Sequence, residues 1–373
     1  MNPFRYGSTV GKEDFCRRPD LENEIKRHIE SRQNIHIEGD RRAGKTSLVF
    51  EVVRDQKHNM LLHFDFQLVK CMADVRARLM TGLSAASSKT GMFEKLVKNL
   101  AHLRPIIGIN PATGEPSLSV RADDTDHLDG RSIGELLEFA RVTFKSHNPV
   151  IFLDEFQDVA KLPEADGLLA IMRSCIQHHH DCTYIYSGSS RSDMDAIFRH
   201  PDSPFYKSAI AVPVGPIARE DFIPFLASKF YSGKRTAPTA ILEEILDLVV
   251  DNPGDVQEVC NCLWDATRTG QTLDRSDVEC ALGLIFGREI KYFEQVLGDM
   301  TSLQKRCLQG LAKCNGQNIY TKAFMIETGV MNTGSITKAV KQLEKRRIIS
   351  AVGKRFVFAS PFLRLWLLRN PSL

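Results

Sequence analysis

Apolar and polar residues in the first part of the chain follow two periods, and their alternation predicts helices interleaved with strands. Residues 21–29 carry apolar side chains at a helical spacing, the short run at 34–38 is typical of a buried strand, and the helical spacing returns at 47–53. A second strand is predicted at 60–66. A glycine-containing loop at 39–44 separates the first strand from the helix that follows it.

A further apolar run lies near the middle of the chain. Residues 150–153 are all apolar, and Asp154 follows them directly. Such a run is typical of a strand that is buried on both faces of a parallel sheet. A helix is expected before it at 132–144, and another strand after it at 183–186. Strands that alternate with helices predict an α/β fold with a parallel sheet.

Two segments depart from this alternation. Residues 102–125 contain two apolar runs around a turn signal at 110–114, and we expect an inserted hairpin there. Residues 214–296 carry helical spacing, for example at 240–250, and we expect a helical lid. The core is accordingly predicted to span residues 1–213.

The last part of the chain has its own order of elements. Helices are predicted at 302–314, 321–328 and 332–345, followed by a hairpin at 348–358. This is the order of a winged helix-turn-helix. We therefore expect a third domain at residues 297–373.

Composition restricts the class of protein. The chain has 373 residues, of which 43% are hydrophobic and 25% charged, as in soluble globular proteins. No window is apolar enough for a membrane span and the N-terminus lacks the pattern of a secretory signal, so we expect a cytoplasmic protein without a membrane partner. The nine cysteines are scattered and include no C-x2-C pair, which argues against a disulfide scaffold or a zinc site.

Charge is distributed unevenly along the chain. Residues 301–373 contain thirteen lysines and arginines and two acidic residues, a balance of +11, whereas the whole chain carries +3. A basic tail on an acidic remainder is typical of a nucleic-acid-binding module. A solvated basic surface that docks on the acidic part of the same chain is the alternative.

The loop after the first strand is a complete P-loop. Its sequence matches G-x4-G-K-[ST] and reads Gly39-Asp40-Arg41-Arg42-Ala43-Gly44-Lys45-Thr46-Ser47. Backbone N–H groups of such a loop form an anion nest at a helix N-terminus, Lys45 bridges the outer phosphates, and the Thr46 hydroxyl ligates Mg²⁺. The whole loop is therefore predicted to bind a nucleotide.

Two acidic residues end the central strand. In a parallel sheet this is the edge where ligands bind. Asp154 is expected to hold the Mg²⁺ water shell opposite Thr46, and Glu155 to orient and deprotonate the water that attacks the γ-phosphate. Glu155 therefore favours hydrolysis of the nucleotide over its mere retention. Asp65, which ends the second strand, is a weaker candidate.

The strand at 183–186 ends in a small polar cluster, residues 187–191. Ser189 is expected to be a γ-phosphate sensor, with an ordinary serine- and glycine-rich turn as the alternative. Arg191 and Arg199 are candidates for stabilising phosphate charge. Cysteines and histidines at 175–182 fit no zinc spacing and are interpreted as a polar connection.

Together these motifs resemble the archaeal-type ATPases of the STAND/AAA+ P-loop superfamily. The resemblance rests on five segments: residues 2–7, 15–21, 39–48, 152–157 and 188–190. It implies an ASCE/AAA+-type parallel sheet, a helical lid that reports the nucleotide state, and ATP with Mg²⁺ as cofactors. Where that family tends to have a Gly-x-Pro lid motif, residues 251–257 have the glycine and proline rearranged.

The winged helix offers candidate contacts to double-stranded DNA. Asn332 or Thr333 can cap its third helix. In winged helices of this order, the N-terminal half of the recognition helix faces the major groove. The expected DNA-contacting residues, four on that helix and two on the wing, are Ser335, Thr337, Lys338, Lys341, Lys354 and Arg355. Winged helices also dock proteins, so a protein partner stays open.

We therefore expect an ATPase that acts as a molecular switch and passes its ATP or ADP state to a DNA-binding winged helix. A nucleotide-gated signalling or assembly scaffold, in which the winged helix docks a protein, is the alternative. An oligomeric ATPase of the replication-initiator or transposition type ranks third, and a homo-oligomer is compatible with all of these.

Overall fold

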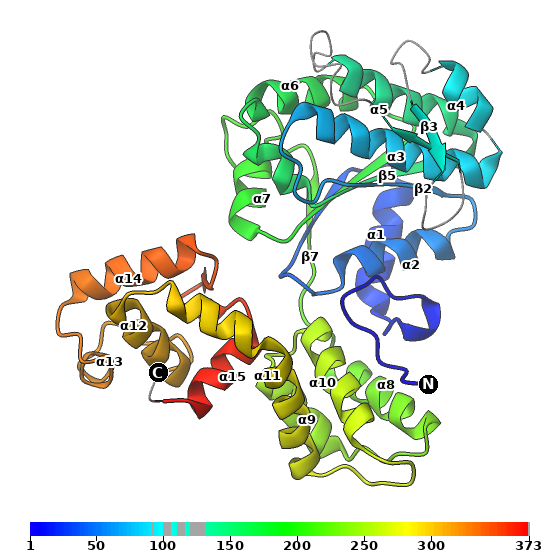
Figure 1. Ribbon diagram of the computed structural model, residues 1–373. Helices are drawn as coiled ribbons and strands as arrows, with labels where there is room; N and C mark the ends of the chain where they lie inside the picture. The colour runs from blue at the N-terminus through cyan, green and yellow to red at the C-terminus, as the bar shows by residue number, and fades with distance from the viewer. Residues whose placement is uncertain (92, 100–105, 110–115, 120–130, 372–373) are drawn as a thin grey trace. The chain divides into compact units, whose positions relative to one another are not determined.

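The computed structural model describes residues 1–91, 93–99, 106–109, 116–119 and 131–371 (Figure 1). It divides into two compact units. One unit is residues 9–216, called the core below. The other combines residues 217–373 with residues 1–8, which we call the N-terminal strap. The predicted division into three domains stays a prediction.

A five-stranded parallel sheet forms the centre of the core. The strands are β1 (Ile35–Glu38), β2 (Met60–Asp65), β5 (Pro149–Asp154), β6 (Thr183–Gly188) and β7 (Ile210–Pro213), in the order β2-β5-β6-β1-β7. Every residue of β1, β5 and β6 is buried. The predicted α/β class with a parallel sheet is confirmed. Strand β6 extends two residues beyond the predicted strand, to Gly188.

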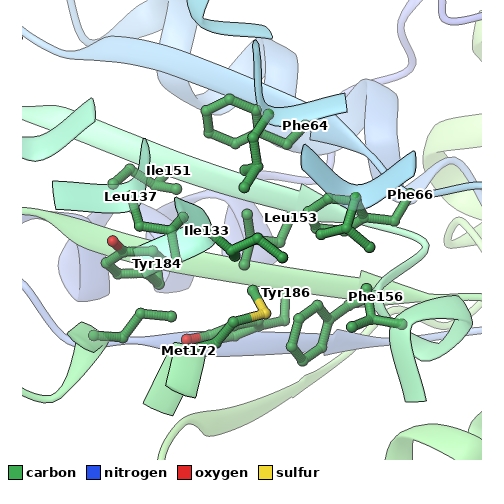
Figure 2. Close-up of a cluster of buried hydrophobic side chains, with 14 of the residues drawn as sticks. Phe64, Phe66, Ile133, Leu137, Ile151, Leu153, Phe156, Met172, Tyr184 and Tyr186 are labelled. Atoms are coloured by element: carbon green, nitrogen blue, oxygen red, sulfur yellow. The ribbon is translucent and has the colours of Figure 1, made fainter. Parts of the chain in front are cut away.

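Helices cover both faces of this sheet, and alternate residues of each strand serve the two faces. The face packed by α1 (Pro19–Glu30) and α2 (Lys45–Asp55) receives Val150 and Phe152 of β5. The opposite face receives Ile151 and Leu153, together with Tyr186 of β6 (Figure 2). It is packed by four helices, α3 (Met72–Thr90), α5 (Arg131–Thr143), α6 (Ala165–Ile176) and α7 (Arg191–Phe198).

The predicted hairpin insertion is present where the structure describes it. Strands β3 (Ile106–Ile109) and β4 (Pro116–Ser119) pair antiparallel, after α4 (Phe93–Asn99). The remaining residues assigned to that hairpin, 102–105, 110–115 and 120–125, lie outside the described residues.

The other unit begins with four helices, α8 (Arg219–Ser232), α9 (Thr239–Leu248), α10 (Pro253–Ala266) and α11 (Arg275–Gly298). The rearranged lid motif forms the start of α10, where the Asn252 side chain accepts hydrogen bonds from the backbone N–H groups of Gly254 and Asp255. Pro253 is the first residue of the helix, where its missing N–H costs nothing.

The N-terminal strap packs among these helices. Phe4 is 1% exposed, and its ring lies 4.5 Å from that of Phe230 and 6.1 Å from that of Trp264, measured between centroids. The Asn261 side chain donates to the Phe4 carbonyl (2.8 Å), and the Asn2 side chain donates to the Asn261 carbonyl (3.0 Å). Phe4 thus anchors the strap in the interior of this unit.

Three helices and a hairpin follow in the predicted order. They are α12 (Ser302–Lys313), α13 (Lys322–Thr328), α14 (Thr333–Lys345), β8 (Ile349–Val352) and β9 (Arg355–Phe358), and α15 (Pro361–Arg369) comes last. Asn332 caps α14, because its side chain accepts from the N–H groups of Gly334 (2.8 Å) and Ser335 (3.2 Å). Every helix among the described residues is too short or too polar to cross a membrane.

Candidate functional site

The P-loop connects β1 to α2 through an unusual backbone. Arg42 and Gly44 both have positive φ angles, of 65° and 84°. At Gly44 this is the left-handed conformation that glycine adopts at least cost. Gly39 is required for a different reason, because a Cβ there would lie 2.6 Å from the Val214 carbonyl oxygen. Helix α2 begins at Lys45, so its free N–H groups lie at the loop, as an anion site requires.

Lys45 is buried inside this loop. Its ammonium group donates to the carbonyl oxygens of Gly39 and Asp40, both at 2.9 Å, and the residue is 6% exposed. Desolvation lowers the pKa of Lys45, while Glu155 and Asp154 oppose that change. The hydrogen bonds of this buried cation go to neutral carbonyls, so its desolvation is offset only in part by the two nearby carboxylates. The site therefore suits an anion that would replace these carbonyls as the hydrogen-bond acceptor of the ammonium group.

Thr46 joins the loop to the end of the central strand. Its hydroxyl donates to Asp154 Oδ2 at 2.8 Å. Asp154 also accepts from the Ser187 hydroxyl, and His63 Nε2 lies 3.5 Å from Asp154 Oδ2. Burial raises the pKa of Asp154, but His63, Ser187 and Thr46 together hold it below its ordinary value. The carboxylate stays ionised, and its hard oxygen beside the Thr46 hydroxyl fits Mg²⁺.

Glu155 lies one residue beyond the strand, in the left-handed conformation (φ 50°). There the chain turns from β5 into a 3-10 helix, η4 (Phe156–Lys161). Glu155 Oε2 accepts hydrogen bonds from the Ser189 hydroxyl (2.8 Å) and the Gln157 side-chain amide (2.5 Å). Two of the predicted catalytic side chains, Glu155 and Ser189, thus lie together at the carboxyl edge of the sheet.

The remaining predicted loop residues have varied surroundings. Ala43 is buried, and its carbonyl accepts from Arg18 (2.9 Å). The Ser47 hydroxyl accepts from the backbone N–H of Val10 (3.2 Å), so it anchors the chain that precedes α1. Arg41 is exposed and Arg42 is half-buried.

The weaker candidates have other contacts. Arg199 forms ion pairs with Glu38 (2.7 Å) and Asp195 (3.2 Å), so its charge is neutralised by carboxylates of the core. Arg191 is exposed at the start of α7. Asp65 accepts from the backbone N–H of Gln67 (2.8 Å), which makes it a turn residue.

The histidine and cysteine segment forms a polar connection. His179 Nδ1 lies 2.7 Å from the Tyr184 hydroxyl, and its Nε2 lies 2.8 Å from Glu138 Oε2. Burial raises the pKa of the nearby Cys175 thiol to about 11. No cluster with the composition of a metal site occurs in the part of the chain that the structure describes.

Sequence reasoning missed three residues of the site. Arg18 donates to Ala43 of the P-loop and to the Gly215 carbonyl (3.0 Å), and His63 and Gln157 contact the two acidic residues. Arg18 lies in the segment 15–21 that carries the family resemblance, which was its only signal.

The candidate DNA-contacting residues lie on α14 and the β8–β9 hairpin. Lys338, Lys341 and Lys354 are exposed, and Ser335 and Arg355 are half-buried. The Thr337 hydroxyl donates to the Thr333 carbonyl (2.9 Å) and lies 3.3 Å from the hydroxyl of Tyr320, an exposed aromatic residue that the sequence did not single out.

Comparisons with known proteins agree with this architecture. Residues 291–369 match the family model described as "Probable winged helix domain". A Walker-type ATPase of Pyrococcus abyssi shares 16% identity, with 98% of this chain and 99% of that chain covered and a TM-score of 0.64. No curated protein matches the sequence.

Two Aeropyrum pernix structures are also similar. The ORC2 protein in its ADP form has 11% identity, coverage of 100% and 98%, and a TM-score of 0.55. The ORC1 protein in complex with DNA has 12% identity, coverage of 98% and 94%, and a TM-score of 0.53. The chain therefore has the fold of the archaeal Walker-type P-loop ATPases with a C-terminal winged helix, which confirms the predicted resemblance at the level of the fold.

Proposed function

We propose that the protein is an ATP-binding and ATP-hydrolysing molecular switch of the STAND/AAA+ type, whose nucleotide state controls a DNA-binding winged helix. The observation that carries the proposal is the hydrogen bond between Thr46 and Asp154, with Glu155 next in the chain. It joins the P-loop to the acidic end of β5 in the arrangement that nucleotide hydrolysis needs.

Each residue has a distinct role in this proposal. The P-loop N–H groups and Lys45 would hold the phosphates, and Thr46 and Asp154 would hold Mg²⁺, partly through water. Mg²⁺ would neutralise charge that develops on the phosphates. Glu155 accepts the proton of the attacking water, and Ser189 donates a hydrogen bond to the γ-phosphate.

Nucleotide binding and phosphate release by the full chain test the first half of the proposal. We expect Mg²⁺-dependent phosphate release from ATP. Lys45→Ala should weaken ATP binding roughly 10- to 100-fold, because it removes charge-assisted hydrogen bonds to phosphate. Lys57→Ala, which removes an exposed lysine of the same unit, is the matched control and should leave binding unchanged. Equal ATP affinity for both variants would refute this site.

DNA binding is the second half of the proposal, and the +11 balance of residues 301–373 supports it. We expect binding to a DNA duplex that weakens steeply with salt. Replacing Lys338, Lys341 and Arg355 together by Ala should abolish it or reduce the slope of log K against log salt by about 0.9 per lost phosphate contact. Titration of a labelled duplex at several salt concentrations measures both quantities.

A control with the same charge change separates specific contacts from net charge. The triple variant Lys234→Ala, Arg268→Ala and Arg275→Ala removes three exposed cations outside the winged helix. It should retain duplex binding. Absence of duplex binding by the wild type at low salt would overturn the DNA half of the proposal.

Two alternatives are compatible with the structure. Ile326 and Met331 are 73% and 74% exposed on the winged helix, which favours a scaffold that docks a protein there. The other alternative is an oligomeric initiator-type ATPase, and the similar fold of the ORC1 protein, which was solved in complex with DNA, is compatible with it. Arg191, exposed at the start of α7, is the candidate for a charge supplied to a neighbouring subunit.

A further inference from the structure

Two donors converge on one oxygen of Glu155. The Ser189 hydroxyl and the Gln157 amide both donate to Oε2, at 2.8 and 2.5 Å. A carboxylate anchored through one oxygen holds its other oxygen, Oε1, in a fixed direction. Orientation of this kind is what a general base needs, since proton transfer depends on geometry before basicity.

Gln157 is built into the core rather than placed on its surface. It is 2% exposed, within a 3-10 helix whose neighbouring residues Phe156 and Val159 are completely buried. Gly188 leaves the space for its side chain, because a Cβ at that position would lie 2.3 Å from Gln157 Oε1. The amide therefore has little freedom to turn away from Glu155.

The same side chain carries an unpaired buried atom. Gln157 Oε1 has no hydrogen-bond partner in the described part of the chain. A buried acceptor without a partner destabilises a fold, so an apolar side chain of similar length would give a more stable protein at this position. A destabilising polar residue beside a candidate general base is the pattern expected when the residue serves the reaction.

Ser189 and Gln157 differ in whether their hydrogen bonds to Glu155 can persist when ATP is bound. A serine hydroxyl has one proton to donate, so Ser189 releases Glu155 when it donates to a γ-phosphate. The next acceptor for Gln157 Nε2 is Asp158 Oδ1 at 3.5 Å, beyond a good hydrogen bond. Gln157 is thus the donor whose hydrogen bond to Glu155 is retained when ATP is bound.

We propose that Gln157 is a positioning residue for ATP hydrolysis, which anchors Glu155 Oε2 so that Oε1 is held ready to accept the proton of the attacking water. This proposal rests on the proposed ATPase function. It assigns to Gln157 a role in turnover that is separate from nucleotide binding.

The test is the kinetics of Gln157→Met, which keeps the length of the side chain and removes the donor. We expect kcat for ATP to fall about 10- to 100-fold, as for other small misplacements of a catalytic group. The KM and the Kd of a nonhydrolysable ATP analogue should change less than twofold. Gln157→Leu, which also removes the donor and keeps a similar volume, should behave alike and serves if the methionine variant does not fold. Gln177→Met, at the exposed residue that directly follows α6, is the matched control.

A double variant separates positioning from a structural role. In a Glu155→Gln background, Gln157→Met should cause no further loss of residual turnover, because the base it orients is gone. An unchanged or increased kcat in the single variant, or a further loss in the double variant, would overturn the proposal. If the wild type itself releases no phosphate from ATP, or Lys45→Ala releases as much as the wild type, the proposed ATPase function fails instead.

Discussion

Glu155→Gln is expected to lower kcat for ATP hydrolysis by about 10²- to 10⁴-fold, the usual contribution of a general base. Glutamine keeps the size of the side chain and can still lie between Ser189 and Gln157, but it cannot accept the proton of water. ATP affinity should stay within a few-fold of the wild type, because in the proposed site Lys45 and the P-loop backbone would hold the phosphates. Phosphate release under single-turnover conditions, together with binding of a fluorescent ATP analogue, measures the two effects separately.

Glu243→Gln is the control for this prediction. Glu243 is exposed on α9 of the other compact unit, so its replacement makes the same chemical change outside the core. Its kcat should equal that of the wild type. Turnover by Glu155→Gln at more than about a tenth of the wild-type rate would contradict the assignment of Glu155 as general base, given the magnitudes expected for such a base.

Phe156→Ala is expected to reduce the free energy of unfolding of the core by about 3–5 kcal/mol, the usual cost of removing a buried phenylalanine ring. Phe156 is 0% exposed. Its ring centroid lies 5.0 Å from that of Tyr186, 5.4 Å from that of Phe205 and 6.2 Å from that of Phe198. Urea denaturation followed by a probe in the core gives the value, since the two compact units can unfold in separate transitions.

Val142→Ala provides the comparison within the same unit. Val142 is 54% exposed on α5, so its truncation should change the free energy of unfolding by less than about 0.5 kcal/mol. A loss below 1 kcal/mol in Phe156→Ala would show that the neighbouring rings close around the space. Because Phe156 follows Glu155 directly, the variant also tests how firmly this aromatic cluster supports the candidate base.

The sequence was sufficient to predict those parts of the site that are contiguous in the chain. The P-loop is one unbroken motif, and Asp154 and Glu155 directly follow a run of apolar residues, so period and composition locate both. The order of three helices and a hairpin at 302–358 could also be predicted from the sequence, because each element has its own periodicity and the third helix has a recognisable cap, Asn332.

Contacts between distant segments could not be predicted in this way. Arg18 reaches Ala43 and Gly215, which lie 25 and 197 positions away in the chain. Ser187 was assigned to the polar cluster that follows the predicted strand, whereas it is the fifth residue of β6 and its hydroxyl donates a hydrogen bond to Asp154. A serine in such a cluster is locally compatible with a turn. Its place in a strand follows only from the parallel pairing of β6 with its neighbours β1 and β5, which the local sequence does not specify.

The N-terminal strap connects the two compact units a second time. The chain passes between its two compact units twice, after Ser8 and after Pro216. A single cut of the backbone at Pro216 would therefore leave residues 1–8 covalently joined to the core. The same residues would still pack among the helices of the other piece, through Phe4, through Asn2 and through the hydrogen bond that Lys229 donates to the Pro3 carbonyl (2.9 Å). After such a cut, these eight residues would connect the core to the piece that carries the winged helix through packing alone, without a peptide bond.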